Sequence, residues 1–247
     1  MRYFFEIAYH GKPYHGWQRQ NNATGVQQVV EECMSTILGQ TVEITGSGRT
    51  DSGVHCRKQY FHIDLDIKLN EKHLIKFNSF LPATIVLRAF HLVDGNAHAR
   101  YDAVERCYEY HISQKRNPFE LDQSMLFLRP LDLSAMGKAG SYLKGEQDFR
   151  SFSKVKTDVN TFICHIFEAS WKQQEDKLVF TIRANRFLRG MVRAIVGTLI
   201  DVGEHKITPE EIKEIILSGD RRKAGFSAPP EGLFLTDVRY PDNYFKD

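Results

Sequence analysis

Hydrophobic and polar residues alternate at the start of the chain, and the pattern then changes to a helical one. Residues 2–9 alternate as a partly buried strand does. A capping-box pattern at Thr24 opens an amphipathic helix, and Gly39 ends it. Two strand-like segments follow, at 41–45 and 58–67, on either side of a glycine-rich loop. The first part of the chain is therefore predicted to form a strand, a helix and two further strands.

The segment 58–67 has two chemically different faces. From Phe61 onward its odd positions are apolar, whereas His62, Asp64 and Asp66 lie on the other face. A row of one His and two Asp can bind a metal ion. Such a row is far more often a strand face in contact with water, and we interpret it in this way.

The first half continues with a helix and a strand. Asn70 is a helix cap, and Pro82 limits the helix because the residue before a proline disfavours helical geometry. Residues 84–93 then read as a strand. The order β-α-β-β-α-β is associated with a ferredoxin-like sheet backed by two helices.

The second half partly repeats this order, although no sequence repeat is recognisable. Its predicted elements are strands at 105–113, 162–171, 178–184 and 233–240, and helices at 132–145, 186–202 and 208–219. We therefore divide the chain into an N-terminal α/β half, 1–103, and a C-terminal α/β half, 104–247.

The helix predicted at 186–202 is the most hydrophobic of the chain, and it carries three arginines near its start. Arg186, Arg189 and Arg193 are three and four residues apart, so a helix would place them on one side. Such a basic stripe beside a buried face could contact phosphates or reach a buried carboxylate. It could equally be a solvated edge, and the spacing alone favours that reading.

Composition excludes several classes of protein. The 247 residues are 42% hydrophobic and 26% charged, as in ordinary globular proteins. No apolar run is long enough to span a bilayer and no signal-peptide pattern is present, so we expect a cytoplasmic protein without a membrane partner. The four cysteines are scattered, which argues against a zinc site. A net charge of +2 is too small to indicate a nucleic-acid partner by itself.

The glycine-rich loop at 46–55 is the strongest candidate for chemistry. Three of its residues are glycines, which allow positive φ and a close approach of another molecule. Asp51 is its only carboxylate, and Arg49 is close enough in sequence to act as a counter-ion. A lone Asp in such a loop is more often a turn-former than a catalyst. Residue types alone therefore leave both readings open.

The exact string of the loop resembles the active-site motif of the tRNA pseudouridine synthase A family. Further strings fall in the order of that family and cover nearly the whole chain. They are Tyr14–Gln20, Val26-Gln27, His98-Ala99-Arg100, Arg106–Tyr110, Met191-Val192-Arg193 and Ala228–Leu233. The chain departs from the family pattern at Ser52 and Cys56, where members often have Ala. Both changes replace one small residue by another, and we expect no loss of chemistry.

The resemblance implies a fold and a reaction. It implies two ferredoxin-like (RRM-like) halves with antiparallel sheets, joined around a central cleft with helices on the outer faces. The implied reaction converts uridine to pseudouridine at positions 38, 39 and 40 in the anticodon stem-loop of tRNA. No cofactor and no metal are required. The family also implies a homodimer with the tRNA lying across both subunits.

The resemblance also assigns roles to individual residues. Asp51 is the catalytic carboxylate, and Arg193 is the cation that keeps it ionised. Arg49 contacts the RNA at the extruded nucleotide, Tyr108 stacks on the uracil, and Leu233 forms an apolar wall of the pocket. Candidate phosphate contacts are Arg19, Arg57, Lys58, Arg100 and Arg106.

Two other functions compete with this one. An RNA-binding protein could keep the fold with Asp51 idle. A glycoside hydrolase also breaks a sugar bond with a carboxylate, but it usually needs two carboxyl groups about 5 to 9.5 Å apart. The loop offers only one.

Overall fold

The alternating residues at the start of the chain form strand β1 (Arg2–Tyr9), which lies between two partner strands in the computed structural model. The structure describes residues 1–155 and 159–245. β1 pairs antiparallel with β3 (His55–Asp64) and with β4 (Ile85–Val93). β2 (Thr45–Gly46) pairs antiparallel with β3, and β10 (Leu233–Arg239) pairs parallel with its start. The order β4-β1-β3-β2 is the ferredoxin-like order that the sequence predicts.

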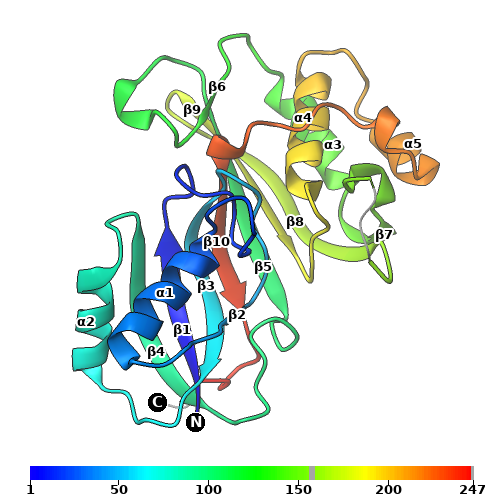
Figure 1. The fold of residues 1–247 in the computed structure, drawn as a ribbon. Coiled ribbons are helices and arrows are strands. Elements are labelled where there is room, and N and C mark those ends of the chain that lie inside the picture. Colours follow the sequence, from blue (N-terminus) through cyan, green and yellow to red (C-terminus); the bar gives the residue numbers. More distant parts are fainter. Residues whose placement is uncertain (156–158, 246–247) are drawn as a thin grey trace. The chain divides into compact units, whose positions relative to one another are not determined.

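Helices α1 (Val26–Leu38) and α2 (Glu71–Phe80) belong to the same unit (Figure 1). Phe77 of α2 contacts Phe5 of β1 with ring centres 6.1 Å apart, and Phe5 stacks on Phe61 of β3 at 5.2 Å. These three rings are fully buried, so the apolar face of the sheet forms the core together with the helices.

The opposite face of this sheet corrects the expectation of a solvated strand face. Phe4 of β1 lies against three aromatic rings from the end of the chain, those of Tyr240, Tyr244 and Phe245. His62 stacks on Phe4 and is only 6% exposed. Aromatic residues near the C-terminus therefore cover part of a face that the strand pattern assigns to water.

The strands of the second unit pair antiparallel in the order β5-β9-β8-β7, and β6 pairs parallel with β5. Its strands are β5 (Glu105–Ser113), β6 (Met125–Leu126), β7 (Gly145–Asp148), β8 (Ile163–Gln174) and β9 (Lys177–Ala184). Its helices are α3 (Leu133–Ser141), α4 (Met191–Gly203) and α5 (Glu211–Ser218). α4 is almost entirely buried, as its broad apolar face predicts. The mixed α/β class expected from the sequence is confirmed.

Short 3-10 helices complete the chain: η1 (Pro118–Glu120), η2 (Arg150–Phe152), η3 (Arg221–Lys223) and η4 (Pro230–Gly232). Contacts divide the chain into Met1–Val104 with the C-terminal residues from Phe234, and Glu105–Leu233. The sequence division assigns the C-terminal residues to the second half. The structure groups them with the first unit because β10 pairs with β3 there. Within the described residues, no helix is both long and apolar enough to cross a membrane.

Two local predictions in the first unit are wrong. The strand expected at 41–45 is reduced to Thr45–Gly46, because Glu31 and Ser35 of α1 accept the backbone N–H groups of Ile44 and Val42. α1 begins after Gly25 rather than at a Thr24 capping box. A Cβ at Gly25 would lie 2.4 Å from the carbonyl oxygen of Gln18, so close backbone packing determines this helix start.

The basic stripe predicted on the most hydrophobic helix does not form. α4 begins at Met191, and Gly190 before it has φ of 71°. Arg186 and Arg189 therefore lie in the preceding loop, where Arg189 O accepts the N–H of Lys154. Only Arg193 of the three arginines lies on the helix.

Candidate active site

The loop that carries Asp51 connects β2 to β3 and reverses direction directly after the carboxylate. Val54 N donates to Asp51 O at 3.2 Å, and Gly53 has φ of 78°. This backbone conformation favours glycine, so Gly53, the glycine that follows Arg49 in the loop, is required by the turn itself. Asp51 is half-buried and Arg49 is exposed.

The segment Tyr14–Gln20 lies against this loop and holds it through the backbone. Trp17 N donates to Thr50 O at 3.3 Å, and Gly53 N donates to Tyr14 O at 3.2 Å. Gly16 has φ of 87°, and a Cβ there would lie 2.4 Å from Thr50 O. The structure therefore brings together two strings that are more than 30 residues apart in the sequence.

Further contacts at either end of the loop come from residues that the sequence did not single out. The hydroxyls of Tyr9 and Thr50 are hydrogen-bonded at 2.9 Å in a buried environment. Gly11 N donates to Nδ1 of His55 at 3.1 Å, and a Cβ at Gly11 would lie 2.0 Å from Val54 O. The residues on both sides of Asp51 are thus fixed by the end of β1 and the turn after it.

Cys56 follows the loop and is not a competing nucleophile. The residue is buried, and its Sγ lies 3.8 Å from Ile7 O. Burial raises the pKa of its thiol well above the ordinary value, so the thiolate is not formed near neutral pH. Asp51 therefore remains the candidate for chemistry in this loop.

Arg193 lies in the second unit, at the third residue of α4. Its Nε donates to Ala228 O at 2.6 Å, and its backbone oxygen accepts the N–H of Ala228 at 3.0 Å. The side chain is half-buried. Two strings of the resemblance, Met191-Val192-Arg193 and Ala228–Leu233, are therefore joined by hydrogen bonds within one unit.

Tyr108 and Leu233 also belong to the second unit. Tyr108 is half-buried on β5, and its ring meets that of Phe187 edge to face at 5.1 Å. Leu233 is 5% exposed and begins β10. Asp51 and Arg49 thus come from the first unit, and Tyr108, Arg193 and Leu233 come from the second.

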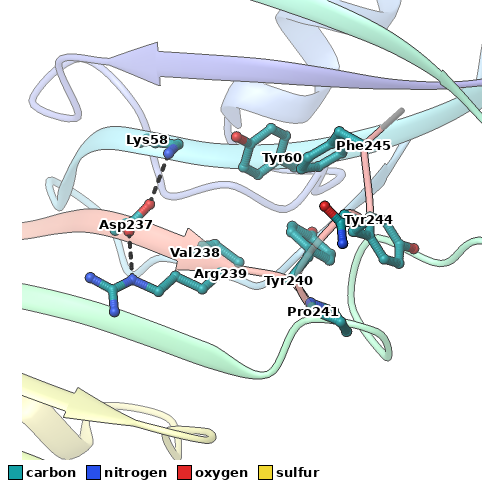
Figure 2. A pocket seen from close by; sticks show the side chains of 10 residues that line it. Lys58, Tyr60, Asp237, Val238, Arg239, Tyr240, Pro241, Tyr244 and Phe245 are labelled. Atoms are coloured by element: carbon teal, nitrogen blue, oxygen red, sulfur yellow. Dashed lines mark hydrogen bonds and ion pairs between the residues drawn. The ribbon is translucent and has the colours of Figure 1, made fainter. Parts of the chain in front are cut away.

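A cavity of about 410 Å³ lies in the first unit, beside β3 and the end of β10 (Figure 2). Lys58 Nζ is 3.2 Å from Asp237 Oδ1, and Arg239 Nε is 3.1 Å from Asp237 Oδ2. One carboxylate therefore partly neutralises both cations. The lining residues are Lys58, Tyr60, 237–241 and 243–245, and none of the five predicted site residues is among them.

The other candidate phosphate contacts have protein partners as well. Arg19 pairs with Glu31 at 2.9 Å, and Arg106 donates to Asn185 O at 2.9 Å. Arg57 lies over the ring of Phe234 and Arg100 over that of Tyr101. Among the residues that the structure describes, no group of three or more His, Cys, Asp and Glu could hold a metal ion.

Comparison with known proteins gives matches over the whole chain. A family model described as tRNA pseudouridine synthase matches residues 139–241. A tRNA pseudouridine synthase A of Bacteroides thetaiotaomicron is 44% identical, with 100% of this chain and 93% of the relative covered. Proteins of the same name from Parabacteroides distasonis and Porphyromonas gingivalis are 44% and 45% identical. Those two alignments cover 99% of this chain and 98% and 99% of the relatives.

Proposed function

Because this chain belongs to the tRNA pseudouridine synthase A family, we propose that it converts uridine to pseudouridine in the anticodon stem-loop of tRNA, at positions 38, 39 and 40. The observation that carries the proposal is the alignment at 44–45% identity over essentially the full length. The alignment includes the first unit, where backbone hydrogen bonds join the loop bearing Asp51 to Tyr14–Gln20.

The reaction is an isomerisation. The C1′–N1 glycosidic bond breaks, uracil rotates, and a C1′–C5 bond forms. C5 then loses its proton and N1 gains one, so no oxidant or co-reactant is consumed. The protein must therefore supply a carboxylate near the sugar, a surface that holds the detached base, and protection from water.

Asp51 is the proposed catalytic carboxylate. It requires a negative charge whether it attacks C1′, adds to the pyrimidine ring or removes a ribose proton. Enclosure around the substrate would favour its neutral form, and a cation beside it offsets that effect. We assign this role to Arg193, whose guanidinium is oriented by the bond from Nε to Ala228 O.

The remaining site residues act on the base and on the RNA. Tyr108 is proposed to stack on the uracil and to assist removal of the C5 proton through its hydroxyl, and Leu233 forms the apolar wall. Arg49 is exposed on the loop and contacts the RNA beside the extruded nucleotide, which must leave its stack at a cost of a few kcal/mol. The first half of the chain thus carries the carboxylate, and the second carries the tyrosine and the Met-Val-Arg string.

The protein is further proposed to work as a cytoplasmic homodimer with the tRNA lying across both subunits. This part of the proposal rests on the family resemblance. The test is light scattering. We expect the mass of two chains for the protein alone, and the mass of two chains plus bound tRNA for the complex. A monomer that retains full activity would contradict it.

The decisive experiment incubates the protein with tRNA carrying tritium at C5 of uridine. Pseudouridine formation releases this tritium, whereas a glycoside hydrolase releases free uracil and an RNA-binding protein only shifts the mobility of the tRNA. We expect Asp51→Asn to abolish release while weakening tRNA binding less than tenfold. Asp66→Asn, an exposed position beyond β3, is the matched control and keeps the wild-type rate. Appreciable turnover by the Asp51→Asn protein would reject the assignment of Asp51.

Arg193→Ala tests the proposed partner of the carboxylate. Removing one member of an enclosed ion pair typically costs about 3–5 kcal/mol. We therefore expect the single-turnover rate to fall by at least about 100-fold, with a much smaller change in tRNA affinity. A rate close to that of the wild type would show that another group keeps Asp51 ionised.

A further inference from the structure

Residues 224–229 form a segment, here named the strap, that lies along α4 in the second unit. Gly225 N donates to the hydroxyl of Thr198 at 2.8 Å, and Ala228 N donates to Arg193 O at 3.0 Å. The guanidinium of Arg221 donates to the carbonyl oxygens of Ala224 and Gly225 at 3.1 and 2.9 Å. Hydrogen bonds thus fix both ends of the strap to the helix or to its own preceding turn.

The strap approaches the helix so closely that side chains would not fit between the two backbones. A Cβ at Gly197 would lie 1.8 Å from Phe226 O, where real Cβ contacts are not shorter than 3.0 Å. A Cβ at Gly225 would lie 2.8 Å from Thr198 N. The position of the strap is therefore determined by the absence of a side chain at Gly197, one helical turn after Arg193.

The strap is also connected to Arg193 directly. Arg193 Nε donates to Ala228 O at 2.6 Å. Because the guanidinium group is planar and rigid, a bond at Nε fixes the plane in which its other nitrogens lie. Just beyond Ala228, Pro229 O accepts the hydroxyl of Tyr110 at 2.8 Å, so this end of the strap is held from β5 as well.

We propose that the strap positions the guanidinium of Arg193 for the reaction, and that Gly197 is a positioning residue although its own backbone need not contact the substrate. The inference rests on the proposed function. It adds that Gly197, a buried residue of α4, affects the rate of the reaction. A methyl group at Gly197 must displace the Phe226 carbonyl from 1.8 Å to at least 3.0 Å. A displacement of about 1 Å at a reacting group can cost about 100-fold in rate.

The test compares Gly197→Ala with Gly203→Ala on the same helix. A Cβ at Gly203 meets the ends of two flexible side chains, Met136 Sδ and Leu131 Cδ2, instead of a backbone atom. Both substitutions replace a buried glycine by alanine in α4. We expect the single-turnover rate of Gly197→Ala to fall about 30- to 100-fold with a tRNA dissociation constant within threefold of wild type. Gly203→Ala keeps both values within threefold.

A double-mutant cycle with Arg193→Lys separates positioning from a general structural effect. If the strap acts through the guanidinium, Gly197→Ala slows the Arg193→Lys protein less than fivefold. Losses that multiply fully would overturn the proposal, as would a Gly197→Ala rate within threefold of wild type. An inactive wild-type protein would instead reject the proposed function itself.

Thr198→Val keeps the proposal testable if Gly197→Ala does not fold. Valine has nearly the shape of threonine but cannot accept the N–H of Gly225. We expect it to slow the reaction about fivefold in the wild-type background and less than twofold with Arg193→Lys. Equal losses in both backgrounds would show that the strap has no positioning role.

Discussion

Asp51 and Arg193 are fixed in place in two different ways, one by contacts to a loop and the other by a helix. Asp51 lies on a loop between a two-residue strand and β3, so the turn itself has little regular hydrogen bonding. Its conformation depends on backbone contacts from Tyr14–Gln20 and on the hydrogen bond between the Tyr9 and Thr50 hydroxyls at the end of β1. The backbone of Arg193 is part of a 13-residue helix, and only the orientation of its side chain depends on another segment, the strap.

Both devices use a glycine to bring a carbonyl oxygen close, but the two glycines differ in conformation. A Cβ added at Gly16, where φ is 87°, would lie 2.4 Å from Thr50 O, whereas one added at Gly197 would lie 1.8 Å from Phe226 O within a helix. A substitution at Gly16 therefore has a steric and a conformational cost. At Gly197 the steric cost is partly offset by the better helix propensity of alanine. The loop is expected to lose stability and rate together, and the helix mainly rate.

Gly16→Ala should have the largest effect of the substitutions considered next. A positive φ costs an L-residue about 1–2 kcal/mol, and the displaced Thr50 carbonyl adds about 1–3 kcal/mol. We expect the free energy of unfolding in urea to fall by about 2–5 kcal/mol and the single-turnover rate by at least tenfold. Gly95→Ala is the control, because no atom lies within 4 Å of a Cβ there. Equal stability of the two variants would show that the loop does not depend on Tyr14–Gln20.

The first unit, which carries Asp51, should lose stability in acid. His62 in this unit is buried against Phe4, and burial together with the charge of Arg2 lowers its pKa from 6.5 to about 4. Between these values the unfolded chain binds a proton that the folded chain does not, so the free energy of unfolding decreases as the pH falls. We expect a loss of about 2 kcal/mol from this residue between pH 7 and pH 4.5.

The measurement is urea unfolding of wild type and His62→Gln at both pH values. Glutamine keeps an acceptor for the N–H of Ala99, which now donates to His62 Nδ1 at 3.1 Å. The variant should lose about 2 kcal/mol less than wild type on acidification. An identical pH dependence of the two proteins would mean that His62 titrates normally in the folded state.

His62 also shows why part of the fold could not be read from the sequence. Strand alternation correctly places His62 and Asp64 on one face of β3. Whether that face meets water depends on Tyr240, Tyr244 and Phe245, which are about 180 residues away and have no periodic pattern that connects them to it. The pattern of one strand cannot indicate what covers it.

Some helix ends can likewise be predicted from the local sequence, and others cannot. Asn70 caps α2 through its own side chain, and Gly39 ends α1 with φ of 67°, so both ends follow from the local sequence. The start of α4 does not. Phe187 continues the apolar pattern of α4 toward the N-terminus, but its ring packs on Tyr108 of β5 from the loop before the helix. Periodicity identifies apolar residues without showing which partner they contact.

The sequence also predicts one part of the candidate site and not another. The string around Asp51 singles out the carboxylate, because its residue types and order are specific. The groups that hold the loop, including the Tyr9 hydroxyl and the Gly11 backbone, act from about 40 residues away through contacts that any strand end could make. Nothing in the sequence singles out Gly197 either, since only the close approach of Phe226 O requires a residue without a side chain there.

Two tyrosines allow the smallest and most closely matched test of the two devices. The hydroxyl of Tyr9 is bonded to Thr50, next to Asp51, and that of Tyr110 is bonded to Pro229, next to the strap residue Ala228. Tyr→Phe at either position removes one buried hydrogen bond, worth about 1 kcal/mol in unfolding free energy. The rates should differ, because Thr50 continues directly into the backbone of Asp51, whereas Arg193 keeps its helix and both of its hydrogen bonds to Ala228. We expect Tyr9→Phe to slow single turnover about fivefold and Tyr110→Phe less than twofold, measured by tritium release alongside urea unfolding. Equal rate losses at equal stability would mean that the loop and the strap hold their side chains in the same way.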